Sequence, residues 1–282
     1  MKLLAIDCST ERMSVALAQG ERRWTHEGGG GAQASAALIP AIIGLLDEAQ
    51  LTLKELDAIA FGQGPGAFTG LRTACAVAQG LALGAKLRLL PIDSLLMLAH
   101  AALNTHPSLP EGMQQSRPSF LEGMQRSNPS LREAERRSNP SLREAKRRSN
   151  PQYLRVLSVL DARMGQVYAA AYEHGPEGWR CLQAPFLNQP EALVLPAGWQ
   201  ELGFVLASNA HAIYPEAFAS TLSQGGVATE AWPQALVMLD LAALAYARGE
   251  SVSPAEALPL YVRDKVALTS AERLAANVSR SA

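Results

Sequence analysis

Two distant parts of the chain open with the same pattern of apolar and acidic residues. An apolar run from Leu3 ends at Asp7, and a second run from Val156 ends at Asp161. After each aspartate, apolar residues return at the sixth, eighth and tenth positions, which is the alternation of a β-strand. Each part therefore predicts a strand, a turn and a second, antiparallel strand. A duplication of this kind restricts the chain to a fold with two similar lobes.

Strand and helix patterns alternate after each of these openings. The first half predicts strands near Trp24, at 58–61 and at 88–90, with helices at 34–49, at 69–83 and from Ser94. The second half predicts strands at 180–186 and 204–207, with helices from about Pro190 and at 234–248. The order βββαβαβα indicates an α/β protein whose two mixed-sheet lobes face a cleft.

An eleven-residue repeat separates the two halves. Its glutamates recur at fixed spacing, at Glu111, Glu122, Glu133 and Glu144. A proline in each copy interrupts any continuous helix. Residues 111–150 hold nine basic and five acidic residues, a net charge of +4, and few apolar anchors. We expect a mobile basic loop, and the alternative is an arm that contacts nucleic-acid phosphates.

Length and composition agree with two lobes. The chain has 282 residues, of which 48% are hydrophobic, so it can bury more than one core. We divide it into an N-terminal lobe (1–106), the insertion (107–152), a C-terminal lobe (153–266) whose last helix is expected to pack on the first lobe, and a tail (267–282). The net charge of −1 argues against a generic basic nucleic-acid-binding domain, and the lack of a long apolar stretch favours a cytoplasmic protein with no membrane contact.

A glycine-rich loop joins an apolar strand to a helix. Its notable residues are Gly62, Gly64, Pro65, Gly66, Phe68, Thr69, Gly70 and Arg72. Thr69 is expected to cap the helix, and the exposed N–H groups can receive an anion. The loop lacks the Gly-Lys-Ser/Thr of a Walker A motif. The alternative interpretation is a turn that only positions the helix.

The two strand-end aspartates form a candidate nucleotide-phosphate cleft. Two-lobed phosphotransferases keep carboxylates at such turns, and here the accompanying residues are Ser9, Thr10 and Arg163 beside Asp7 and Asp161. Neither aspartate is followed by the glycine that lets a backbone approach phosphate. The alternative is that each carboxylate accepts hydrogen bonds from its own turn.

The sequence predicts no metal site and no catalytic residue. The five histidines never occur as His-x-x-x-His, and the three cysteines stand far apart with no Cys-x-x-Cys spacing. No Gly-x-Ser-x-Gly elbow is present, which argues against a hydrolase triad.

Two helices carry more apolar residues than one buried stripe requires. The candidate partner interface consists of Leu38, Ile42, Leu45, Leu71, Cys75, Ala78 and Leu81. The alternative is that these side chains are buried inside the lobe.

Together these segments resemble the bacterial TsaB family, also called YeaZ. The matching motifs are the opening at 3–10, the glycine loop at 62–72 with 78–84 after it, the Leu-Asp-Ala-Arg-Met-Gly hairpin at 160–168, and 259–263. The likeness extends over nearly the whole chain except the insertion and the tail.

The resemblance implies an actin-like (ASKHA) fold with two RNase H-like lobes. It also implies a subunit without catalytic activity of its own, which supports TsaD in transferring a threonylcarbamoyl group to tRNA. The implied partners are TsaD, the ATPase TsaE, tRNA through the assembled complex, and, as an alternative assembly, a second copy. We expect no cofactor on this chain alone, with ATP or ADP held at the partner interface. The competing hypothesis is an active Mg- and ATP-dependent enzyme that uses Asp7 and Asp161.

Overall fold

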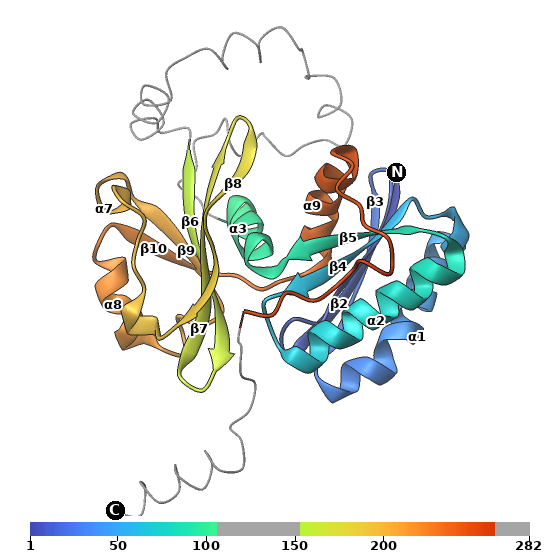
Figure 1. The fold of residues 1–282 in the computed structure, drawn as a ribbon, viewed down its shortest axis with the longest axis horizontal. Coiled ribbons are helices and arrows are strands. Elements are labelled where there is room, and N and C mark those ends of the chain that lie inside the picture. The colour runs from blue at the N-terminus through green and yellow to red at the C-terminus, as the bar shows by residue number, and fades with distance from the viewer. Residues whose placement is uncertain (106–152, 263–282) are drawn as a thin grey trace, which may run out of the picture.

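The computed structural model describes residues 1–105 and 153–262 (Figure 1). The predictions for the repeat insertion and for the tail lie outside these residues. Among the described residues, no helix combines the length and the apolar character needed to cross a membrane.

The first lobe is a five-stranded sheet with the order β3-β2-β1-β4-β5. Its elements are β1 (Lys2–Asp7), β2 (Arg12–Gln19), β3 (Arg22–Gly29), α1 (Ala32–Ala49), the 3-10 turn η1 (Leu53–Glu55), β4 (Ala58–Gly64), α2 (Phe68–Ala85), β5 (Arg88–Asp93) and α3 (Ser94–Thr105). Strands β1, β2 and β3 are antiparallel, whereas β4 and β5 run parallel to β1. The predicted order βββαβαβα is confirmed.

The second lobe repeats this order as β8-β7-β6-β9-β10. Its elements are β6 (Leu154–Arg163), β7 (Gln166–Gly175), β8 (Gly178–Asn188), the 3-10 turn η2 (Pro190–Ala192), α7 (Trp199–Leu202), β9 (Phe204–Ser208), α8 (Pro215–Leu222), β10 (Gly226–Glu230) and α9 (Ala235–Ala247). The prediction of a helix from about Pro190 is wrong, because only a 3-10 turn forms there. Helix α8 and strand β10 were not among the predicted elements.

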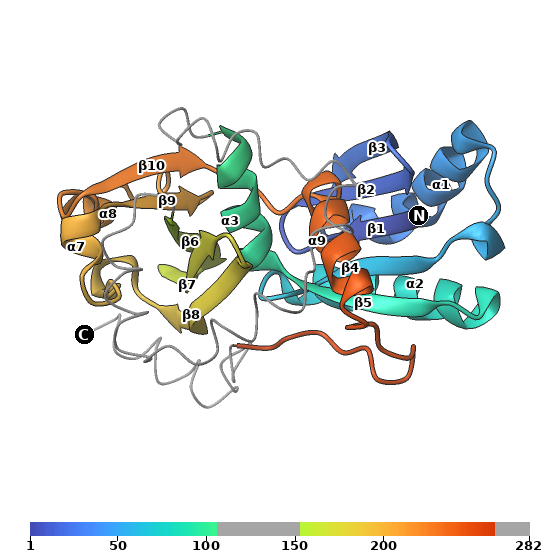
Figure 2. The same cartoon turned by 90° about the horizontal axis from the view of Figure 1, so that it is seen from above.

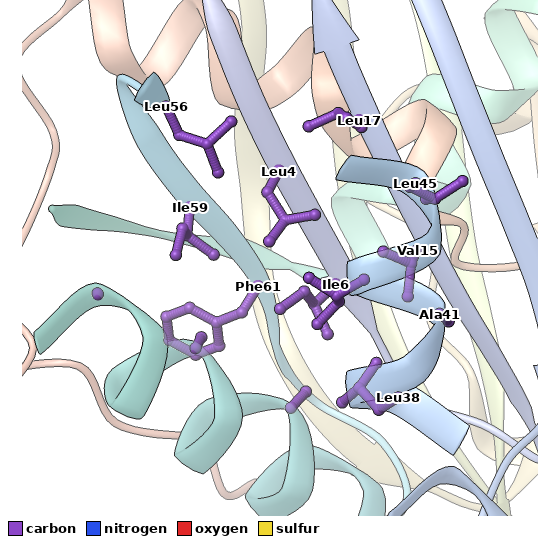
Figure 3. Packing of buried hydrophobic residues seen from close by; sticks show 14 of the residues in the cluster. Leu4, Ile6, Val15, Leu17, Leu38, Ala41, Leu45, Leu56, Ile59 and Phe61 are labelled. Carbon is purple, nitrogen blue, oxygen red and sulfur yellow. The ribbon is translucent and has the colours of Figure 1, made fainter. Parts of the chain in front are cut away.

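Alternate residues of each central strand serve two different cores. On β1, Leu4 and Ile6 face α1 and α2, where they pack with Leu38, Phe61 and their neighbours (Figure 3). Leu3 and Ala5 point to the opposite face and pack against α9. This burial on both sides explains why β1 is an apolar run without polar alternation.

The two lobes exchange helices. Helix α3 ends the first lobe but packs on the second sheet, where Leu95 and Leu98 contact residues of β6 and β7. Helix α9 ends the second lobe but packs on β1, β2, β4 and β5 of the first sheet, so the two helices lie between the sheets (Figure 2). The exchange ties the lobes together through two cores.

The residues after α9 also belong to the first lobe. We call 251–262 the C-terminal strap. Val252 and Leu89 exchange backbone hydrogen bonds of 2.8 and 3.0 Å. Ala257 is buried in the core between the first sheet and helices α1 and α2. The Leu260 N–H donates to the Gln63 carbonyl at 2.7 Å. Residues 252–260 of the predicted C-terminal lobe (153–266) therefore lie on the first lobe, whereas Val262, the last described residue, packs against the core of the second lobe.

Candidate functional site

The glycine loop packs directly on the turn between β1 and β2. The Ala67 N–H donates to the Ser9 carbonyl at 2.7 Å. A Cβ atom at Gly66 would collide with the Ser9 carbonyl, and one at Gly70 would collide with the Cys8 carbonyl. These glycines are needed for close backbone approach. The geometry favours a loop that seats α2 against the turn over one that leaves its N–H groups open to an anion.

The rest of the loop is held by the C-terminal strap and by α2. Gly64 has a φ of 113° and is followed by the cis bond to Pro65, and a Cβ there would lie 2.8 Å from the Leu260 carbonyl. The expected cap at Thr69 is not formed, because Ala67 occupies the N-cap position and makes no side-chain cap bond. Thr69 lies inside the first turn, and its carbonyl accepts the Thr73 hydroxyl.

Asp7 is buried at the end of β1, with only 1% of its surface exposed. Its Oδ2 accepts the Ser9 N–H at 3.2 Å and the Ser9 hydroxyl at 2.9 Å. Its Oδ1 has no hydrogen-bond partner in the described part of the chain and faces Gly62. Burial raises the Asp7 pKa to about 6, and the Ser9 bonds oppose that rise. Thr10 closes the turn by accepting the Arg12 N–H at 3.1 Å.

Asp161 occupies the equivalent place at the end of β6, yet it is well supplied with donors. Its Oδ1 accepts the Arg163 N–H and the Tyr214 hydroxyl, each at 3.1 Å. Its Oδ2 lies 3.3 Å from the Arg163 guanidinium. Three successive residues, Arg163, Met164 and Gly165, have φ values of 65°, 58° and 69°, which shape a tight turn. Both aspartates thus accept hydrogen bonds from their own turns.

One contact joins these two turns across the lobes. Arg163 Nη2 lies 3.2 Å from Glu11 Oε2. Among the described residues, no group of three or more His, Cys, Asp or Glu side chains is placed to hold a metal ion. The arrangement holds the two hairpins together, and most of its polar atoms are committed to the fold.

Six of the seven predicted partner residues belong to the lobe's own core. Leu38, Ile42, Leu45, Leu71, Cys75 and Ala78 are at most 4% exposed, and Leu81 is partly buried against the same cluster. Six of the residues named for the interface are therefore enclosed by their own lobe, and only Leu81 keeps part of its surface exposed. The alternative of burial within the lobe is what the structure has.

The exposed side of the same two helices is also apolar, and the residues named for the partner interface do not lie on it. We call this surface the outer helix face (Figure 1). Its exposed members are Ala36, Ile39, Pro40, Ile43 and Gly44 of α1 and Arg72, Ala76, Gly80 and Leu83 of α2. Ile43 is 52% exposed and Leu83 is 74% exposed. The exposed apolar residues recur every three or four positions in the sequence. The buried residues of the same helices recur at the same spacing, so spacing alone does not separate the two sets.

Comparison with known proteins gives a consistent picture. A family model described as "TsaD: tRNA N6-adenosine threonylcarbamoyltransferase" matches residues 30–113. The tRNA threonylcarbamoyladenosine biosynthesis protein TsaB of Haemophilus influenzae is 28% identical over 275 residues, 94% of this chain and 95% of that protein. The Escherichia coli protein of the same name is 28% identical over 273 residues, 95% of this chain and 96% of that protein.

A solved structure extends the likeness to the fold. YeaZ from Pseudomonas aeruginosa superimposes with a TM-score of 0.68 at 31% sequence identity. The match covers 92% of this chain and 99% of that one. The similarity therefore spans both lobes, including the helices exchanged between them.

Proposed function

The chain belongs to the TsaB (YeaZ) family, and on that basis we propose that it is a non-catalytic subunit that supports a TsaD-type enzyme. The protein takes part in tRNA threonylcarbamoyladenosine biosynthesis. We further propose that it is required together with TsaD and TsaE. These proteins transfer a threonylcarbamoyl group from threonylcarbamoyl-adenylate to adenosine in tRNAs that read codons starting with A.

The outer helix face is the observation that carries the scaffold role. It presents Ile39, Ile43 and Leu83 to solvent beside small residues that allow another helix to approach closely. The TsaD family model matches residues 30–113, which include both α1 and α2. A TsaD-type partner is therefore expected to carry a helix pair of the same kind. Two such pairs can bury their apolar faces against each other.

The contacts of the Asp7 turn argue against a nucleotide phosphate at this place. The Ser9 N–H already donates to Asp7, and the Ser9 carbonyl already accepts the Ala67 N–H. Glycines 66 and 70 fill the space against this backbone. A phosphate would have to displace these contacts. In our proposal any ATP or ADP is held at the interface with the partner, and Asp7 and Asp161 hold their turns in shape.

Co-elution with a TsaD-type subunit tests the proposal. The variant Ile43→Lys places a charge on the outer helix face, four residues before Asp47, so the helix itself is not weakened. Ile213→Lys is a matched control, because Ile213 is 51% exposed but lies in the second lobe, before α8. We expect the parent and Ile213→Lys to co-elute with TsaD on size exclusion and Ile43→Lys to elute alone. Failure of the parent to co-elute would contradict the proposed function.

A further inference from the structure

An arginine is held in a fixed position at the start of α2. The Arg72 guanidinium carbon lies 3.9 Å from the Phe68 ring centroid and 5.8 Å from that of Tyr261. The Arg72 Nε–H donates to the Tyr261 hydroxyl at 2.9 Å, and the two rings are 5.3 Å apart. A guanidinium held by a hydrogen bond and stacked on a ring loses less side-chain entropy when it binds something further.

The terminal nitrogens of this arginine have no partner within residues 1–105 and 153–262. Arg72 is exposed, and within residues 1–105 and 153–262 no carboxylate lies within ion-pair distance of it. Within the described residues, the side-chain hydrogen bond of Arg72 uses Nε, so Nη1 and Nη2 have no partner there and can donate to another group. Arg72 is thus already positioned to bind an anionic or carbonyl oxygen.

Arg72 belongs to the outer helix face. It precedes Ala76, Gly80 and Leu83 by four, eight and eleven residues, which places all four on one side of α2. The Ser35 and Thr73 hydroxyls are 3.5 Å apart, so the N-terminal ends of α1 and α2 lie together. Arg72 therefore lies at the N-terminal end of the face.

The opposite end of the face has the opposite charge. Asp47 and Glu48 are exposed in the last turn of α1 and outnumber the exposed cation Lys86 at the C-cap of α2, and the last carbonyls of both helices add the negative end of the helix dipole. Two like helix pairs packed antiparallel would bring the positive end of one against the negative end of the other. That pairing would bury the apolar residues of both faces and place opposite charges together at each end.

We propose that Arg72, positioned by Phe68 and Tyr261, is the polar anchor of this interface and receives the C-terminal end of a helix of the TsaD-type partner. It binds carboxylate or main-chain carbonyl oxygens there. The inference rests on the proposed function, since it assumes that the outer helix face is the partner surface. It adds a role for the C-terminal strap, because Tyr261 carries the hydroxyl that orients the arginine.

Titration calorimetry of full-length variants with the TsaD-type subunit tests this anchor. The variants are Arg72→Gln, Arg72→Lys and Tyr261→Phe. The matched control is Arg22→Gln, because Arg22 also stacks on an aromatic ring, 4.7 Å from Trp24, but lies on the edge strand β3. Circular dichroism melts establish that each variant is folded.

We expect Arg72→Gln to weaken binding by about ten-fold or more, as for the loss of a charge-assisted hydrogen bond. Its Kd should also depend less on salt than that of the parent. Arg72→Lys should recover part of the affinity, and Tyr261→Phe should weaken binding by about three-fold, a smaller loss because the charge remains. Arg22→Gln should bind like the parent.

Parent-like binding of Arg72→Gln overturns the anchor, and if Ile43→Lys still abolishes binding, the proposed function survives. If Arg72→Gln impairs only self-association, the anchor serves a second copy and the inference is wrong. The inference is equally wrong if the variant binds TsaD normally but weakens tRNA binding by the complex, since the ligand is then a phosphate.

Discussion

The hairpin turns of the two lobes begin from the same pattern and end in different environments. The Asp7 turn is buried beneath the glycine loop, and one carboxylate oxygen has no partner among the described residues. The Asp161 turn has its carboxylate held by Arg163 and Tyr214, and its tip residue Met164 is 76% exposed. The first turn has become part of a core, whereas the second projects from the surface. A duplicated fold does not imply a duplicated site.

The largest expected effect comes from adding a methyl group at Gly70 of α2, which packs against the Asp7 turn. Gly70→Ala drives a Cβ into the Cys8 carbonyl, a backbone atom that cannot move aside. We expect a loss of about 3 kcal/mol or more in unfolding free energy. This corresponds to a fall of about 6 °C or more in the melting temperature.

The matched variant is Gly165→Ala in the second turn, where no atom lies within 4 Å of the added Cβ. The alanine would still have to adopt the positive φ of 69°, which is unfavourable for a residue with a Cβ atom. The expected loss of unfolding free energy is therefore about 1–2 kcal/mol. If scanning calorimetry showed the same loss of stability for Gly70→Ala and Gly165→Ala, the proposed difference in packing between the two turns would be contradicted.

A second comparison uses the pH dependence of stability. The Asp7 pKa is raised by burial from 3.8 to about 6, so the folded state holds its proton more tightly than the unfolded chain. Stability contributed by this group is therefore present below about pH 4 and is lost as the pH rises to 6. A shift of roughly two pKa units corresponds to about 3 kcal/mol.

Asp7→Asn removes this titration. Relative to the parent, we expect the variant to gain about 1–3 kcal/mol in unfolding free energy at pH 8 and no advantage at pH 4. Asp161→Asn should give no such gain at pH 8, because both oxygens of the buried Asp161 carboxylate already have donors from Arg163 or Tyr214. Urea denaturation between pH 4 and pH 8 measures the unfolding free energy of both variants. An Asp7→Asn variant less stable than the parent at pH 8 would contradict the burial argument.

The smallest effect is expected where the turns meet. Arg163 and Glu11 are 66% and 52% exposed, so their contact is screened by solvent. A double-mutant cycle with Glu11→Gln and Arg163→Gln should give a coupling below about 1 kcal/mol that falls as salt is added. A coupling that is large and independent of salt would mean that the turns form a more enclosed site.

Much of the fold was predictable because the local patterns are strong. The hairpins followed from apolar alternation after Asp7 and Asp161, and the glycine loop followed from its place between an apolar run and a helix. These features depend on residues close together in sequence. The resemblance of the same motifs to TsaB predicted the family that the comparisons show.

The errors have a common physical origin in long-range packing. Both sides of α1 are apolar at helical spacing, so the sequence could not tell buried Ile42 from exposed Ile43. The spacing of Gly62, Gly66 and Gly70 became meaningful only when the loop was seen against the Asp7 turn. The strap is held on β5 and the glycine loop partly by backbone hydrogen bonds, which leave no pattern of side chains in the sequence.

Reconstituted tRNA modification tests the scaffold role most directly. The assay would supply threonylcarbamoyl-adenylate through TsaC, the enzyme that makes it according to the family resemblance, together with TsaD and TsaE. These would be combined with the parent chain, with no addition, with the double variant Asp7→Asn/Asp161→Asn, or with Ile43→Lys. The account predicts modification with the parent and with the double variant, and none with Ile43→Lys or without the chain. Loss of modification in a double variant that is folded and still binds TsaD would contradict it, because the aspartates would then take part in the reaction.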